Sequence, residues 1–261
     1  MRKKLLFVLV LTTVLNLSAF AQFGSVSGNG NVVKKTRNVG SFSEIEARGV
    51  INLFLTQGSK NEILIEADEN LHDIITTDVE GGRLIIKNEE NVKNFEKFNV
   101  FVTFREINAL SGSGATDIEV LSPISTSANF YVSSSGASDM LLREGLDCRE
   151  LNISGSGSAD IELMDVSSNK TEVQASGSVD LEIEGKTNAI TMDASGSSDI
   201  SAKNFVANNA SVSASGSSDI YVHAKSSIMV NANGSSDVYY WGNPTNKQIK
   251  SSRAADVELK Q

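Results

Sequence analysis

A short phrase that recurs over the last two thirds of the chain constrains the fold most. It reads Ser-Gly, two small residues, Asp and an apolar residue, with Asn replacing Ser in the last copy. Each copy supplies one glycine, at Gly114, Gly136, Gly157, Gly177, Gly196, Gly216 and Gly234. Each also supplies one aspartate, at Asp117, Asp139, Asp160, Asp180, Asp199, Asp219 and Asp237. Seven copies in one register indicate an array of like structural units.

The residues on both sides of each glycine alternate between apolar and polar. Around Gly157, for example, Ile153 lies four positions before, and Ile161 and Leu163 lie four and six positions after. This period of two is typical of strands with one buried face, and glycine lets the chain turn between them. A repeat of about 20 residues fits one coil of a parallel β-helix, since a propeller blade needs about 40. We therefore predict an all-β, single-stranded parallel β-helix with capped ends.

The same register extends beyond the seven copies at both ends. Phe42–Leu55 matches it with Gly49 in place and Asn52 at the aspartate position. Ile249–Leu259 also matches, with Arg253 replacing the glycine. These matches predict at least one further coil on each side of the regular block.

The first third of the domain is bulkier and more aromatic than the rest. The 65 residues from Gly49 to Gly114 leave room for about three coils of the predicted length. Residues 32–110 are therefore expected to form either wide coils or a β-rich cap, followed by regular coils over residues 111–261. Near the other end, the Tyr-Tyr-Trp-Gly-Asn-Pro segment at 239–244 is interpreted as a lid over the last coils, because solenoids need covered ends.

The N-terminus has the features of a secretory signal peptide. Met1–Lys4 carries three basic residues, Leu5–Leu17 is apolar, and Ala19-Phe20-Ala21 fits a cleavage site. We predict cleavage after Ala21, a flexible stretch over residues 22–31 and one domain over residues 32–261. The product is expected to be exported to the periplasm, the cell surface or the medium, without a transmembrane segment.

The composition excludes several classes of function. A formal net charge of −9 argues against nucleic-acid binding, which needs clustered Lys and Arg to neutralise phosphates. One Cys and two His are too few to form a disulfide framework or a multi-Cys metal site. Cys148 is expected to be an unpaired thiol near a turn, and His72 and His223 to be exposed surface residues.

Taken together, these motifs resemble the head GIN domain family, described as putative auto-transporter adhesins of Bacteroidetes. The resemblance rests on the Gly-Val-Ile-Asn opening at residues 49–52, the serial Ser-Gly-x-x-Asp phrases and the segment at 239–244. It covers roughly residues 32–261. It implies a right-handed parallel β-helix and a role in cell adhesion at the cell envelope, and it brings no catalytic residues with it.

The aspartates of the seven copies are expected to stack as a column, one per coil. Like charges about 4.8 Å apart repel by about 1 kcal/mol per pair in water, so something should offset them. In the favoured interpretation each Asp caps its own turn by accepting hydrogen bonds from Ser or backbone N–H groups. A Ca²⁺ ion between adjacent coils and a catalytic carboxylate pair are the alternatives. We predict no metal and no cofactor.

Tyrosines and the single tryptophan near the C-terminus are the candidate binding residues, because such side chains stack on sugar rings and protein surfaces. An apolar end cap is the alternative for the tryptophan. The candidates are Tyr221, Tyr239, Tyr240 and Trp241, with Tyr131 as a further tyrosine.

Three functions remain open at the level of the sequence. The first is an exported, non-catalytic adhesin or binding module for glycans or cell-surface proteins. The second is a polysaccharide-cleaving enzyme. We do not favour it, because no repeat contains a distinct cluster of reactive side chains that the other repeats lack. The third is a self-assembling envelope protein, for which a homo-oligomer would be expected.

Overall fold

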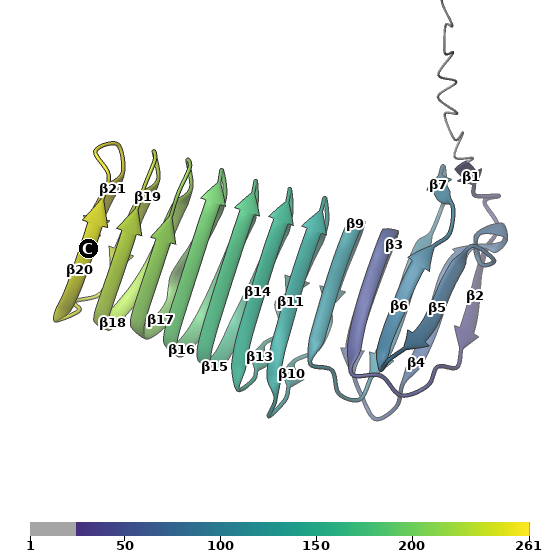
Figure 1. Cartoon of the computed structure of the whole chain (residues 1–261). Helices are drawn as coiled ribbons and strands as arrows, with labels where there is room; N and C mark the ends of the chain where they lie inside the picture. Colours follow the sequence, from purple (N-terminus) through teal and green to yellow (C-terminus); the bar gives the residue numbers. More distant parts are fainter. Residues whose placement is uncertain (1–24, 261) are drawn as a thin grey trace, which may run out of the picture.

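The computed structural model describes residues 25–260, so the predicted signal peptide lies outside the described residues. Nearly all secondary structure in this range is β, and the described part contains one 3-10 turn, η1 (Glu69–Leu71), and no α-helix. Figure 1 shows the strands stacked side by side along one axis, with a differently built cap at the N-terminal end. None of the described residues belongs to a helix that could cross a membrane.

Regular coils make up the greater part of the molecule. They comprise β9 (Ala109–Val120), β10 (Ile124–Ser125), β11 (Asn129–Gly136), β12 (Asp139–Leu142), β13 (Leu146–Asp147), β14 (Glu150–Gly157), β15 (Asp160–Gly177), β16 (Asp180–Gly196), β17 (Asp199–Ala214), β18 (Asp219–Ala232) and β19 (Asp237–Trp241). Each coil pairs in parallel with the next, with glycine over glycine and aspartate over aspartate. The predicted parallel β-solenoid is confirmed.

The core lies inside the coils and follows the predicted alternation. Residues four positions before each glycine are at most 2 % exposed, namely Leu110, Val132, Ile153, Val173, Met192, Val212 and Val230. Each such side chain packs between its counterparts in the coils above and below, so burial is continuous along the axis. This continuity is the main source of stability in a solenoid, where each coil contacts only its neighbours.

The glycine corner is required by both conformation and space. Gly177 has a φ of 101°, a region that L-residues enter only with strain. A Cβ atom added there would lie 2.6 Å from the carbonyl oxygen of Gly157 in the preceding coil. The same close approach of backbone to backbone recurs at each regular coil from Gly114 to Gly234. Only glycine therefore allows the coils to stack at their normal spacing.

The N-terminal cap is built around β3 (Glu44–Gln57), the first coil. The other cap strands are β1 (Ser25–Ser27), β2 (Val32–Arg37), β4 (Glu62–Asp68), β5 (Ile75–Glu80), β6 (Arg83–Asn88), β7 (Asn91–Lys93) and β8 (Phe98–Phe104). One edge of β3 pairs in parallel with β9, and its other edge pairs in parallel with β6 and β8. Three antiparallel pairings, β2–β4, β4–β8 and β5–β6, complete the cap.

The first third of the domain combines features of the two possibilities left open, wide coils and a β-rich cap. Because β3 pairs directly with β9, the 65 residues from Gly49 to Gly114 insert no coil between these strands. They lie on the far edge of β3, where β6 and β8 add one parallel layer in register with both halves of β3, and the antiparallel strands β2, β4 and β5 complete the cap. Buried aromatic residues such as Phe98 and Phe104 fill it, since antiparallel layers leave more interior space than the tight glycine corners.

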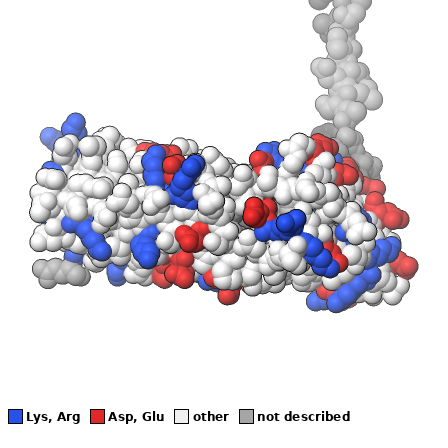
Figure 2. Space-filling model, turned by 90° about the horizontal axis from the view of Figure 1, so that it is seen from below, with Lys and Arg blue, Asp and Glu red and all other residues white. Residues whose placement is uncertain are grey.

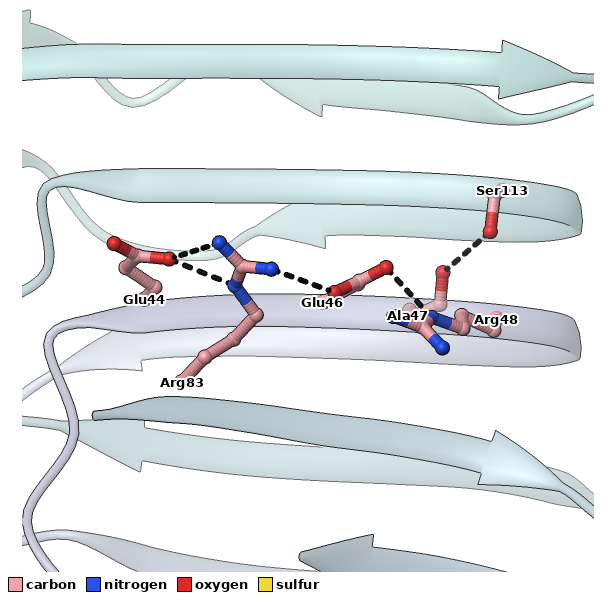
Figure 3. Close-up of polar contacts among 6 residues, drawn as sticks. All are labelled: Glu44, Glu46, Ala47, Arg48, Arg83 and Ser113. Atoms are coloured by element: carbon pink, nitrogen blue, oxygen red, sulfur yellow. Dashed lines mark hydrogen bonds and ion pairs between the residues drawn. The ribbon is translucent and has the colours of Figure 1, made fainter. Parts of the chain in front are cut away.

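Polar contacts join the cap to the first coil. The Arg83 guanidinium on β6 lies 2.7 Å from the Glu44 carboxylate and 3.4 Å from that of Glu46. Glu46 also pairs with Arg48 at 2.6 Å, and this hydrogen bond is the main reason that the pKa of Glu46 is lowered. The Ser113 hydroxyl donates to the Ala47 carbonyl at 3.5 Å across the β3–β9 junction (Figure 3).

The C-terminal end consists of β20 (Asn246–Ser251) and β21 (Asp256–Leu259), which pair with β18 and β19. The segment at 239–244 forms no lid, because Tyr239–Trp241 continue β19 in register with Tyr221–His223. Strand alternation turns Tyr240 into the core, where it is 6 % exposed. The neighbours Tyr239 and Trp241 are half-buried on the outer face.

Candidate functional site

The predicted aspartates stack as a column along one face of the solenoid. Each lies directly beside its counterpart in the adjacent coil, from Asp117 through Asp237. The structure extends the column to Asp256 at the C-terminal end. At the other end Asn52 and Asn99 take the same position, and the Asn52 amide donates to Asn99 at 3.1 Å. The column therefore changes from carboxylates to amides where the cap begins.

Hydrogen bonds at the corner differ from the predicted turn capping. Oδ1 of Asp199 accepts from the backbone N–H of Asp219, and Oδ1 of Asp237 from that of Asp256, both at 3.3 Å. These bonds run to the next coil, not to the aspartate's own turn. At four of the seven aspartates the preceding residue is an inward-pointing serine, and this serine caps the turn instead. At Ser138, Ser198, Ser218 and Ser236 the buried hydroxyl donates to the carbonyl three residues earlier.

Stacking affects the ionisation of the column. Partial burial, followed by the neighbouring carboxylates, raises the pKa of Asp139, Asp160 and Asp219. This is the expected result of like charges held in register. Within residues 25–260, no set of three or more His, Cys, Asp or Glu side chains is placed to hold a metal ion. Ca²⁺ binding between coils is only an alternative to the predicted absence of a metal, and both stay predictions.

A shallow groove of about 540 Å³ runs beside the column across β12 and β15–β18. Asp139, Asp160, Asp180 and Asp199 line it, together with Leu141 and Tyr221. Arg143 also lines the groove, and its guanidinium forms an ion pair with Glu162. On the face drawn in Figure 2, basic and acidic side chains are interspersed over the rod, without a continuous basic stripe.

Three aromatic rings gather at the C-terminal end of the same face. Tyr221 on β18 stacks on Tyr239 of β19, with ring centroids 5.2 Å apart and planes inclined by 23°. Trp241, which lies on the same face of β19 as Tyr239, also stacks on Tyr221, with centroids 6.3 Å apart. We call Tyr221, Tyr239 and Trp241 the aromatic platform. The parallel register produces it, because Tyr239 lies beside Tyr221, and Trp241 lies two residues further along β19.

Two lysines flank the aromatic platform. The Nζ atom of Lys203 lies 4.9 Å from the centre of the Trp241 ring, and that of Lys260 lies 4.6 Å from the centre of the Tyr239 ring. Both distances suit cation–π contacts. Sequence reasoning missed these lysines. The repeat register could have found them, since each occupies the position of Trp241 in its own coil, seven residues after the corner.

The platform and its lysines surround a second shallow groove of about 500 Å³. Ser201 and Tyr221 line both grooves, so the two form one continuous depression along this face. The Tyr239 hydroxyl donates to Asp237 at 3.4 Å. Burial and the nearby carboxylates raise the pKa of Tyr221 and Tyr239, so both phenols stay protonated at neutral pH and can donate hydrogen bonds.

The remaining predicted residues lie elsewhere. Tyr240 is buried and is not part of the surface, which corrects its prediction as a binding residue. His72 is 2 % exposed inside the cap, not on the surface as predicted, because the β2–β4 layer covers it. Cys148 is a buried free thiol whose pKa is raised by burial to about 12. Tyr131 is 49 % exposed on β11, away from the platform.

Comparison with known proteins identifies related sequences and folds. A family model described as a putative auto-transporter adhesin, head GIN domain, matches residues 41–244. A putative adhesin from Parabacteroides distasonis has 24 % identity and a TM-score of 0.82, covering 91 % of this chain and 100 % of its own. A putative lipid binding protein from the same species has 23 % identity and a TM-score of 0.79, covering 90 % and 100 %.

A putative adhesin from Parabacteroides merdae has 21 % identity and a TM-score of 0.77, covering 91 % of this chain and 99 % of its own. At these identities the crystal structures share the fold with this chain, and their ligands do not transfer. A search of curated proteins finds no match.

Proposed function

The chain belongs to the family of putative auto-transporter adhesins with a head GIN domain, and from this premise we propose an exported, non-catalytic adhesin that binds glycans through its aromatic platform. The single observation that carries the proposal is the stack of Tyr221, Tyr239 and Trp241 over an open groove. Half-buried aromatic rings with polar edges are suited to the apolar faces and hydroxyl groups of sugars.

The surroundings of the platform favour a neutral or amine-bearing glycan over an anionic one. After burial, which is the largest cause, the carboxylates of Asp219, Asp199 and Asp237 also raise the pKa of the Tyr221 phenol. Of the two flanking ammonium groups, that of Lys260 is already paired with Glu258. An anionic sugar would meet more uncompensated negative charge than positive charge, which disfavours it.

A non-catalytic role is supported by the uniformity of the carboxylates. Glycoside hydrolysis needs two carboxyl groups whose environments push their pKa values apart, one acting as acid and the other as base or nucleophile. In the column the perturbed pKa values all move in the same direction and for the same reasons. This pattern supports a surface that binds, and it offers no acid–base pair with divided roles.

The arrangement of the termini suits display of the platform. The strand nearest the predicted signal peptide, β1, lies at the cap, while β19–β21 lie at the opposite end of the rod (Figure 1). The platform therefore lies at the end of the rod that is remote from the N-terminal cap. This placement supports presentation to a partner at the cell envelope.

The test is retention of the exported protein on a panel of insoluble and immobilised bacterial and host polysaccharides. Trp241→Ala is expected to weaken retention at least about tenfold, as for a central aromatic residue of an interface. Tyr131→Ala is the matched control, because Tyr131 is also an exposed tyrosine but lies on another face. Equal retention of the Trp241→Ala protein and the parent would remove the platform from the proposal.

The same incubation tests the enzymatic alternative. Soluble sugars in the supernatant are measured by mass spectrometry after incubation with each polysaccharide. Retention without released oligosaccharides is expected. Oligosaccharides released by the parent and not by an Asp160→Asn, Asp180→Asn double variant would contradict the non-catalytic proposal.

A further inference from the structure

The C-terminal end of the solenoid exposes side chains that belong to the core in every regular coil. Ile249 and Leu259 occupy inward positions, in register with Val230 and Tyr240. Val230 and Tyr240 are 1 % and 6 % exposed. Ile249 and Leu259 are 42 % and 44 % exposed. An apolar patch therefore lies across the end of the rod.

The backbone at this end is also open on one side. Strands β20 and β21 pair on their inner edges with β18 and β19, and no pairing of their outer edges occurs among residues 25–260. Unpaired strand edges are templates for pairing with another chain. Both the apolar patch and the edges are thus suited to one kind of partner, another β-structure laid across the end.

The opposite end of the molecule also has an open strand edge among the described residues, on β2, but it suits β20 less well because both strands are basic. There the antiparallel strands β2, β4 and β5 cover the coils, and the outermost strand β2 carries Lys34, Lys35 and Arg37. Head-to-tail stacking would place this cap, which is not a regular coil edge, against β20 and β21. The surface complementary to the C-terminal end is the C-terminal end itself, as in an isologous two-fold contact.

The charges of the last coil support this two-fold arrangement. Lys250 on β20 and Asp256 on β21 lie at equal distances from the corner residue Arg253, three positions before and after it. Neither takes part in an ion pair among the described residues. A two-fold axis through the corner brings residues at equal distances from Arg253 opposite each other, with the strands antiparallel.

We propose that two copies of this chain associate through their C-terminal ends, with β20 of one copy pairing antiparallel with β21 of the other. Lys250 then faces the partner's Asp256, and Ile249 faces the partner's Val257. The pairing closes both open edges at once and buries the apolar patch on each side. The charge pair, the apolar pair and the strand pairing each occur twice by symmetry, and the same register sets Leu259 opposite the aliphatic stem of the partner's Lys247, which occupies an inward position of β20.

The experiment measures the mass of the protein, produced from the full chain, by light scattering and sedimentation equilibrium from about 1 μM to about 1 mM. The parent is expected to approach twice the monomer mass as the concentration rises. Lys250→Asp, which places like charges opposite each other at two symmetric positions, is expected to weaken the dimer at least about tenfold. The charge-swapped double variant Lys250→Asp, Asp256→Lys is expected to recover dimerisation to within about threefold of the parent.

Ile249→Ser tests the apolar contact, and Met229→Ser is its matched control, because Met229 is 50 % exposed on a lateral face of β18. Only the first substitution is expected to weaken the dimer. Thermal unfolding of each variant at low concentration verifies that its fold is intact. A monomer at all concentrations, or a dimer indifferent to Lys250→Asp and Ile249→Ser, would overturn the proposal.

Discussion

The regular coils and the N-terminal cap solve the same packing problem in opposite ways. In the coils, small residues and glycine corners let one backbone approach the next, so like residues stack in columns. In the cap, large side chains such as Phe98 and Phe104 fill the space between strands that run in both directions. The same packing recurs in every regular coil, whereas the packing of the cap occurs only once in the described residues.

This difference shows where a solenoid can acquire a specific surface. Outward positions do not affect stacking, so they are free to vary from coil to coil without disturbing the core. The position held by Glu162 and Glu182 in two coils is held by Tyr221 and Tyr239 in two others. Specialisation of the face therefore needs only substitutions in one column, while the cap carries the irregular structure that covers the end.

Substitution of a glycine at a corner of the coils should lower the free energy of unfolding most, and more than substitution of a glycine in the cap. Gly177→Ala combines a positive φ with a Cβ atom 2.6 Å from the Gly157 carbonyl oxygen, and is expected to cost about 3 kcal/mol or more of unfolding free energy. Gly81→Ala in the cap hairpin, where a Cβ atom meets nothing within 4 Å, is expected to cost only about 1 kcal/mol. Urea denaturation measures both, and similar losses would show that the corners are not specially constrained.

Acidification should have the next largest effect, because it should destabilise the cap more than the regular coils. Burial, and to a lesser degree Lys35 and Arg37, lower the pKa of His72 from 6.5, and its Nε2 lies 3.1 Å from the Val33 carbonyl oxygen. Below about pH 6.5 the unfolded chain binds a proton that the folded cap does not, so the cap loses stability as the pH falls. Amide exchange in β2, corrected for intrinsic rates, should accelerate from pH 7 to pH 5 relative to β16.

The His72→Gln variant keeps a donor for Val33 and has no titrating ring. Its β2 amides should show the same protection at both pH values after correction. If the parent and this variant respond equally to acid, His72 is not the source of the effect.

Removal of one charge from the aspartate column should have the smallest effect on the free energy of unfolding. Unlike the changes above, it should stabilise the protein. The pKa of Asp160 is raised, so its ionised form opposes folding above that pKa and the opposition disappears as the pH falls toward the unfolded value near 4. Asp160→Asn is expected to stabilise the coils at pH 7 by up to about 1 kcal/mol, less in high salt. Asp193→Asn, outside the column, is the control, and thermal unfolding is the measurement.

The sequence by itself determined the repetitive part of this protein. Gly157 with Ile153, Ile161 and Leu163 predicts both the corner and the buried face, because these features depend on local conformation and a period of two. The register of one coil on the next follows from the same residues, since a slip of one residue would turn Ile161 outward and a slip of two would misalign the glycine corners. Asp160 could be placed in a column for the same reason, although its hydrogen-bonding role could not.

Only the tertiary structure decided the cap, the surface and the ends. The antiparallel pairings of β4 join segments far apart in sequence, and no local pattern specifies which edge a strand will join. The inward turn of Tyr240 and the burial of His72 likewise depend on what packs around them. The aromatic platform and its flanking lysine bring together Trp241, Tyr221 and Lys203 from three successive coils, which meet only because the coils stack in register.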